Sequence, residues 1–375
     1  MPPRFLVVLA ALRLAVASYA SSAVPTHLPP LETPGDSGEA RARRTDVAIE
    51  WSRLERTTIT AHPDRDELLL ELPPVNLPAG TSVDQPASVG EFPVNGFIYA
   101  LHAEIVDENG RHLPSQLLHH MNVMDPSERE LFLPISRRIL ASGMETGEIR
   151  FPWLLFGARF RAGQRILANA MIHNPTATGY RGVRVRLVVS YVPERRPWPL
   201  FSVLPWQLDV GFPVGDKSFD LPPGRSERSY EGSPAVDGKL LVIGGHMHAY
   251  GRTIEFWDAT TGKMLWHGEP ATPSPGQPSA VPLTKFYSLT GIGLRITPTH
   301  RYRVRVIYEN ATGQTIQAGG MGVVGGLFMP DRKAVWPATD ATDSLYQQDL
   351  LHFMGPVGKP AEVIPLSRTH SHVGH

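Results

Sequence analysis

Five histidines and one methionine are the residues in this sequence whose types and spacing could bind a metal ion. The chain contains 15 histidines and no cysteine. Zinc-thiolate sites, iron–sulfur clusters, disulfides and cysteine nucleophiles are therefore excluded. Any metal must be held by imidazole, thioether or oxygen ligands. The candidate ligands are His119, His120, His173, His246, His248 and Met321.

The first candidate group is the adjacent pair His119-His120. Neighbouring side chains on a regular strand point to opposite faces, so the pair could share one metal only at a bulge or a strand end. Asn122 and the Asp-Pro step at Asp125 favour such an end. His173 lies at a second predicted strand terminus. Taken singly, each of these histidines could also be an ordinary core or surface residue.

The second candidate group is His246-Met247-His248. Alternate residues share one face of a strand, so both imidazoles should point the same way, roughly 6.5–7 Å apart at the backbone. Met247 is then expected in the core on the other face. The apolar run at residues 240–245 ends in two glycines and predicts that the pair follows a buried strand.

Met321 is the candidate sulfur ligand, because the glycine-rich segment 317–325 leaves its thioether prominent; Met329 is the rival. Imidazoles with a thioether and no nearby carboxylate favour copper over zinc or non-haem iron. The nearest acid after His248 is Glu255, whose odd offset puts it on the opposite strand face. The pattern therefore predicts copper.

Strands must position these ligands, since long helical periodicity is scarce. Apolar residues alternate with arginines at residues 183–187 and again at 302–306, which predicts strands with one buried and one wet face. The 34 glycines and 36 prolines fit short strands joined by many turns. Residues 127–141 could form a short helix. The fold class is predicted to be all-β.

The length allows two domains, and the recurrence of the strand pattern indicates that they are of similar construction. A positive start, an apolar run and small residues predict a cleaved export signal, so the protein is expected to be secreted or periplasmic. No later stretch qualifies as transmembrane, and the balance of 36 basic and 36 acidic residues argues against nucleic acid. A glycosylation sequon begins at Asn310. The predicted segments are a signal peptide (1–23), a disordered leader (24–45), an N-terminal β-sandwich with the first site (46–192), a proline-rich linker (193–205), a C-terminal β-sandwich with the second site (206–355) and a flexible tail (356–375) with His370, His372 and His375.

The ordered set of motifs resembles the copper type II, ascorbate-dependent monooxygenases, the group of peptidylglycine α-hydroxylating and dopamine β-monooxygenases. The resemblance covers roughly residues 50–345. It implies two jelly-roll-like antiparallel β-sandwich domains, two copper ions, ascorbate as reductant, and hydroxylation of a C–H bond of a small substrate by O2. The motifs that carry it are His119-His120-Met121, His173, His246-Met247-His248 with Gly251-Arg252, and Met321.

The resemblance also implies a role for each ligand. His119, His120 and His173 would bind the electron-transfer copper. His246, His248 and Met321 would bind the copper at which oxygen is activated. The lack of cysteine departs from animal members and fits a bacterial-style member. The positions that grip a peptide substrate in amidating members are Gly244, Val323 and Gly325 here, so peptide amidation is not expected and the substrate stays open.

Three other functions remain open from the residues. A non-catalytic copper-binding or copper-delivery protein would keep the same ligands. A single-metal cupin-like enzyme would use only His246 and His248, although Arg252 and Thr253 stand where a glutamate is usual. A structural adhesion or carbohydrate-binding sandwich would use none of them. The oligomeric state is not indicated.

Overall fold

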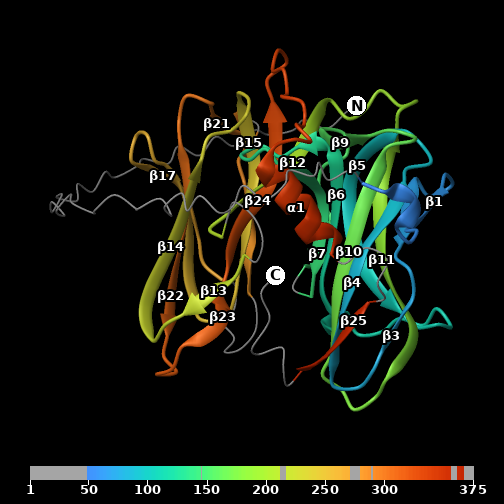
Figure 1. Ribbon diagram of the computed structural model, residues 1–375. Helices are drawn as coiled ribbons and strands as arrows, with labels where there is room; N and C mark the ends of the chain where they lie inside the picture. The colour runs from blue at the N-terminus through green and yellow to red at the C-terminus, as the bar shows by residue number, and fades with distance from the viewer. Residues whose placement is uncertain are drawn as a thin grey trace, which may run out of the picture. The chain divides into compact units, whose positions relative to one another are not determined.

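The computed structural model describes residues 49–144, 146–211, 217–270, 279–288, 290–355 and 361–366. The expected signal peptide, the leader and the three histidines of the tail lie outside these residues. Strands dominate the described chain, which confirms the all-β, sandwich-like fold class. Its one described α-helix is near the C-terminus (Figure 1).

The elements follow one another closely along the chain. Those up to residue 193 are η1 Trp51–Arg53, β1 Thr58–His62, β2 Glu67–Glu71, β3 Val75–Leu77, β4 Thr81–Glu91, β5 Gly96–Val106, η2 Ser115–Leu117, β6 Leu118–Arg129, β7 Ser136–Gly143, β8 Ile149–Arg150, β9 Phe156–Phe160, β10 Arg165–Asn174 and β11 Tyr180–Pro193. Those that follow are β12 Phe201–Asp209, β13 Phe219–Leu221, β14 Gly224–Gly232, β15 Gly238–Met247, β16 Gly251–Asp258, β17 Lys263–Gly268, β18 Ser279–Lys285, β19 Tyr287–Ser288, β20 Gly291–Ile292, β21 Leu294–Ile296, β22 Tyr302–Asn310, β23 Ile316–Gly320, β24 Gly322–Pro330, α1 Ser344–Met354 and β25 Glu362–Pro365.

The first sandwich packs the sheet β25-β4-β10-β6-β7 against the strands β1-β2-β11-β5-β9. Strand β11 shows the alternation predicted from the sequence. Val183, Val185 and Leu187 are buried between the sheets. The two arginines between them lie on the other face and form ion pairs with Glu71. The predicted half-buried strand is confirmed.

The second sandwich packs the strands β12-β24-β15-β18 against the sheet β14-β22-β16-β17. Strand β22 repeats the pattern of β11. Tyr302, Val304 and Val306 are buried. The intervening arginines pair with Glu231 and Glu255 on neighbouring strands. This second predicted strand is confirmed as well.

One polar turn occurs in both sandwiches. The side-chain nitrogen of Asn174 donates to three backbone carbonyls, and Thr176 donates to its side-chain oxygen. Asn310 and Thr312 make the same arrangement in the second sandwich. Asn310 is only 1% exposed and its amide nitrogen is fully used. The sequon at Asn310 is therefore a buried structural turn, and a glycan on that nitrogen would break its three hydrogen bonds.

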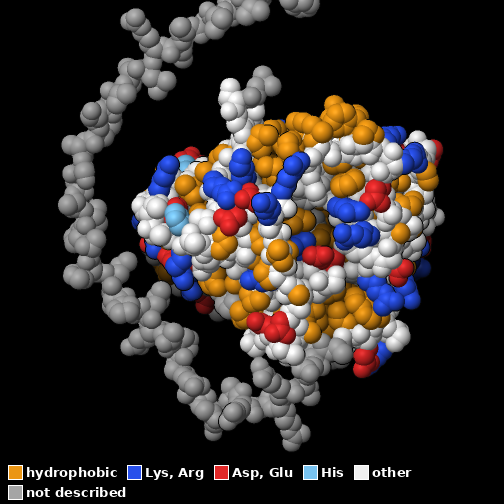
Figure 2. Space-filling view, turned by 90° about the horizontal axis from the view of Figure 1, so that it is seen from above, with side chains coloured by type: hydrophobic (Ala, Val, Ile, Leu, Met, Phe, Trp, Pro, Cys, Tyr) orange, Lys and Arg blue, Asp and Glu red, His pale blue; other side chains and the backbone are white. Residues whose placement is uncertain are grey.

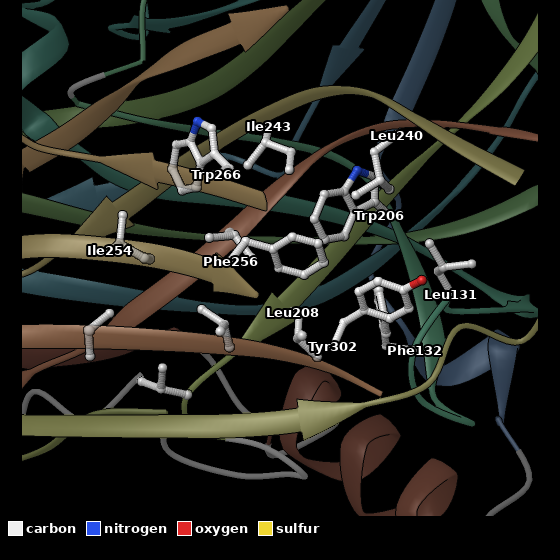
Figure 3. Close-up of a cluster of buried hydrophobic side chains, with 14 of the residues drawn as sticks. Leu131, Phe132, Trp206, Leu208, Leu240, Ile243, Ile254, Phe256, Trp266 and Tyr302 are labelled. Atoms are coloured by element: carbon white, nitrogen blue, oxygen red, sulfur yellow. The ribbon is translucent and has the colours of Figure 1, made fainter. Parts of the chain in front are cut away.

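The two sandwiches share a hydrophobic core. The chain between β6 and β7, residues 130–135, leaves the first sandwich and enters the second. Phe132 contacts Trp206 and Tyr302, with ring centroids 5.6 and 6.3 Å apart (Figure 3). Leu131 and Leu133 lie in the same cluster. The helix considered for residues 127–141 is wrong, because this segment consists of two strand ends joined by a loop anchored in another core.

Helix α1, which follows the strands of the second sandwich in the chain, packs on the first sandwich. It lies beside β4, β7 and β10 of the first sandwich (Figure 1). Its apolar face packs on Leu54, Met124 and Leu167. Asp349 of α1 accepts two hydrogen bonds of 2.6 Å from Arg138 of β7. Each sandwich thus contributes a segment to the other.

Two sequence predictions about irregular segments are wrong in part. Residues 362–365, expected in a flexible tail, form β25, because the edge of β4 offers backbone hydrogen bonds. The proline-rich stretch 193–205 contains the end of β11 and the start of β12. Pro205 is tolerated there because β9, the partner on one side of β12, pairs only as far as Val203.

The parallel pairing of β9 with β12 joins strands of both sandwiches into one 12-stranded sheet. Among the described residues, no helix is both long enough and apolar enough to cross a membrane. On the face shown in Figure 2, basic and acidic side chains lie near one another among apolar ones.

We expect Phe132→Ala to lower the free energy of unfolding by about 3–5 kcal/mol, because a buried aromatic side chain is lost from a shared core. Denaturant unfolding measures this change. The matched control is Leu200→Ala, whose side chain is 58% exposed and should change stability by less than about 0.5 kcal/mol. Equal effects of the two substitutions would contradict the shared core.

Candidate metal centre

His119 and His120 lie at a β-bulge in β6. Leu118 pairs with Ile172 of β10 and His120 pairs with Met171, so His119 is an extra residue between two consecutive pairs. The bulge lets neighbouring side chains approach one another, and the two ring centroids are 5.1 Å apart. Of the two arrangements that the sequence left open, a bulge or a strand end, the structure has the bulge.

His173 joins this pair from the end of β10. Its ring stacks on His119 with centroids 4.2 Å apart and planes 10° from parallel. Its Nε2 atom is shielded from solvent. Parallel stacked rings do not direct their nitrogens at one point, so shared coordination requires rotation of a side chain. Within the described ranges, no three His, Asp or Glu side chains are already arranged around a common metal position.

His246 and His248 lie where β15 ends, on one face as the spacing predicts. Their ring centroids are 5.8 Å apart and nearly perpendicular, at 89°. Met247 between them is fully buried in the core. Glu255 accepts hydrogen bonds from Trp257 and Arg305. That carboxylate is therefore engaged within its own sheet.

A buried tyrosine connects the backbone of His248 to that of Met321. The Tyr308 hydroxyl accepts a 3.0 Å hydrogen bond from the N–H of each residue. It donates in turn to the Met321 carbonyl. Tyr308 is 0% exposed, and burial raises the pKa of its hydroxyl, so it stays a proton donor. One hydroxyl thus brings two segments that are far apart in the sequence next to each other.

Glycine allows the methionine segment to lie this close to β22. A Cβ atom on Gly322 would come within 2.2 Å of Val306 Cγ1. Met329, the rival sulfur, lies opposite Lys239 and packs in a different apolar cluster with Phe156. The structure places Met321, rather than Met329, at the cavity that is also lined by His246 and His248.

Residues of both candidate groups face one cavity of about 840 Å³. One wall is the outer face of the sheet β4-β10-β6-β7, and the other is the outer face of β12-β24-β15-β18. His173, which stacks on His119, is not among the residues that line the cavity. The predicted ligands that line the cavity are His119, His120, His246, His248 and Met321.

The cavity walls are mainly apolar, and their cations have carboxylate partners. Arg138 pairs with Asp349 at 2.6 Å, and the Lys217 ammonium lies 3.9 Å from Asp209. Burial raises the pKa of Asp209, while nearby Lys217 opposes this rise; burial also lowers the pKa of Lys217. The apolar lining includes Ile139, Leu140, Phe151, Phe156, Val203, Val242, Val281, Leu283, Val323, Leu327 and Phe353.

Sequence reasoning missed three residues of this site. Tyr308 continues the buried face of β22 that begins at Tyr302, so its depth could have been inferred from the alternation. Gln207 and Asp209 alternate with the apolar Trp206 and Leu208, which is a strand signal. The strand was not predicted because the prolines just before Trp206 indicated a linker.

No protein-family model matches this chain, and no curated protein matches it. Among solved structures, PNGF-II is 11% identical over 74% of this chain and 62% of that chain, with a TM-score of 0.30. The VP2 subviral particle of infectious bursal disease virus is 11% identical over 88% and 85%, with a TM-score of 0.24. The mavirus major capsid protein is 8% identical over 84% and 93%, with a TM-score of 0.21. Matches at this level carry no argument about function.

Tyr308→Phe should speed amide hydrogen exchange at His248 and Met321 and destabilise the fold by about 1–3 kcal/mol, since buried backbone groups lose their partner. Exchange followed by NMR measures the local effect. Tyr302→Phe is the matched control, because Tyr302 lies on the same strand and its hydroxyl likewise accepts from a backbone N–H, that of Thr297. Unchanged exchange at His248 and Met321 in Tyr308→Phe would contradict the bridging role.

Proposed function

We propose that this protein is a copper-dependent monooxygenase that hydroxylates a C–H bond of a small substrate with O2 and an ascorbate-type reductant. One oxygen atom would enter the C–H bond as hydroxyl and the other would leave as water, with two electrons from the reductant and two protons. The observation that supports this proposal most is that five of the six candidate ligands, from distant parts of the sequence, line one cavity, and the sixth, His173, stacks on His119.

The donor set fits copper. Histidines alone make up the first group, and two histidines with a thioether make up the second. His119, His120 and His173 would hold one ion; the second would be held by His246, His248 and Met321. When bound, the ions would supply one-electron steps to dioxygen, and a thioether ligand favours Cu(I).

The remaining residues of the cavity bind substrate and limit water. Apolar side chains from both walls suit an apolar molecule. Gly244, Val323 and Gly325 bring no charge to the floor of the cavity. Since Arg138 and Lys217 already have carboxylate partners, a peptide carboxylate finds no dedicated cation. This supports a substrate other than a peptide, and the N-terminal segment 1–23 supports action outside the cytoplasm.

The copper content of the purified protein and its oxygen uptake test the proposal together. We expect two copper ions per chain and ascorbate-driven oxygen consumption that stops when a chelator removes the metal. Consumption should rise further with a suitable apolar substrate. Two ions without turnover would favour a carrier, and one ion would favour a cupin-like site. Copper bound no more tightly than by scattered surface histidines would refute both sites.

Met321→Leu should weaken Cu(I) binding at the second site by at least the roughly 10–100-fold typical of disturbed metal sites, while the first site keeps its ion. Competition with a Cu(I) chelator measures this affinity. Met329→Leu is the matched control, because its sulfur lies in another cluster. A larger loss from Met329→Leu than from Met321→Leu would show that the wrong sulfur was assigned.

A further inference from the structure

Strand β12 presents two polar side chains to the cavity, each with one buried atom that makes no hydrogen bond to the described residues. The Gln207 Nε2 atom and the Asp209 Oδ2 atom are both shielded from solvent, and neither has a hydrogen-bond partner among the described residues. The other oxygen of Asp209 accepts from the Gly211 N–H at 2.7 Å. Asp209 itself is 0% exposed. Buried polar atoms in native proteins normally bond to protein, water or a ligand, so both atoms are available to a polar group in the cavity.

The strand register places both groups beside the second candidate metal site. Asp209 lies opposite Val323, which lies opposite His246. Gln207 lies opposite Gly325 of β24, which lies opposite Gly244 of β15 in the next row. All members of a cross-strand row share one face of the sheet. The two polar groups therefore border a glycine floor that leads from β12 toward the histidines.

The charges around this floor select an uncharged ligand. The Asp209 carboxyl already faces the side-chain nitrogen of Lys217, 3.9 Å away. Arg138, the other cation on the lining, is held by Asp349. An anionic ligand would meet the Asp209 carboxylate, and a cationic one would compete with Lys217. A neutral hydroxyl or amide meets neither obstacle.

We infer that Gln207 and Asp209 form a polar subsite that binds the single hydroxyl or amide group of an otherwise apolar, uncharged substrate. The Gln207 amide can offer its nitrogen as donor or its oxygen as acceptor, and Asp209 Oδ2 accepts. The apolar walls contact the rest of the molecule. This inference rests on the proposed function in naming the ligand a substrate, but binding at the subsite does not require metal.

A site with buried polar groups discriminates against ligands that leave those groups unpaired. A matched set of probes exploits this: 4-phenylbutan-1-ol, butylbenzene and 4-phenylbutanoate. Their affinities for the full chain, prepared free of copper, are measured by calorimetry or ligand-detected NMR. We expect the alcohol to bind about tenfold more tightly than the hydrocarbon, as one net hydrogen bond implies. The carboxylate should bind more weakly than the alcohol.

Gln207→Met and Asp209→Asn are the test variants. Gln207→Met should bring the affinities for alcohol and hydrocarbon close together without weakening the hydrocarbon. Asp209→Asn should reduce the preference for the alcohol over the carboxylate. Gln317→Met and Asp64→Asn, both on exposed residues outside the cavity, should leave all three affinities unchanged. Circular dichroism verifies folding, and the Gln207 variant alone decides the matter if Asp209→Asn does not fold.

Two results overturn the subsite: an alcohol preference that persists in Gln207→Met, or a wild-type protein that shows no preference or binds none of the probes. Failure of the proposed function looks different. The preference for the alcohol could be present and be lost in Gln207→Met while the protein binds no copper. That result would support the subsite and refute the oxygenase. Binding of two copper ions by a protein that shows no preference for the alcohol would support the metal sites and refute the subsite.

Discussion

The exchange of segments between the two sandwiches is the constraint on which the cavity depends. Phe132 from the first sandwich lies among the aromatic rings of the second, and α1 from the C-terminal part covers the sheet of the first. The ion pair of Arg138 with Asp349 fastens α1 beside β7. Two charges buried together hold their geometry strictly, because separating them would leave each uncompensated. The walls that carry the candidate ligands are consequently set at one spacing.

Within that frame, local irregularities bring the ligands together. A bulge gives His119 and His120 neighbouring positions, although they would diverge on a regular strand. The Tyr308 hydroxyl joins the backbone of His248 to that of Met321. Gly322 allows the approach that this hydroxyl requires. The second group is thus held through the backbone and leaves the side chains of His248 and Met321 to face the cavity.

Much of this arrangement could be predicted from the residues, and the failures have physical causes. The alternation at residues 183–187 and 302–306 predicts buried faces correctly, because a half-buried strand requires that pattern. The prolines at residues 193–205 predicted a linker wrongly, since a strand tolerates proline at a position where pairing with one neighbouring strand has ended. Residues 130–135 carry apolar side chains whose partners belong to another sandwich, and no local pattern records which core they enter.

The sequence by itself determined the strand content and the shared face of His246 and His248, because these follow from the two-residue period of the extended chain. Only the tertiary structure decided that His119 and His120 line one cavity with His246 and His248, that Met321 rather than Met329 lies there, and that Gln207 and Asp209 face it. Those facts depend on contacts between residues far apart in the chain, which the exchange of segments and the register of β12, β24 and β15 establish.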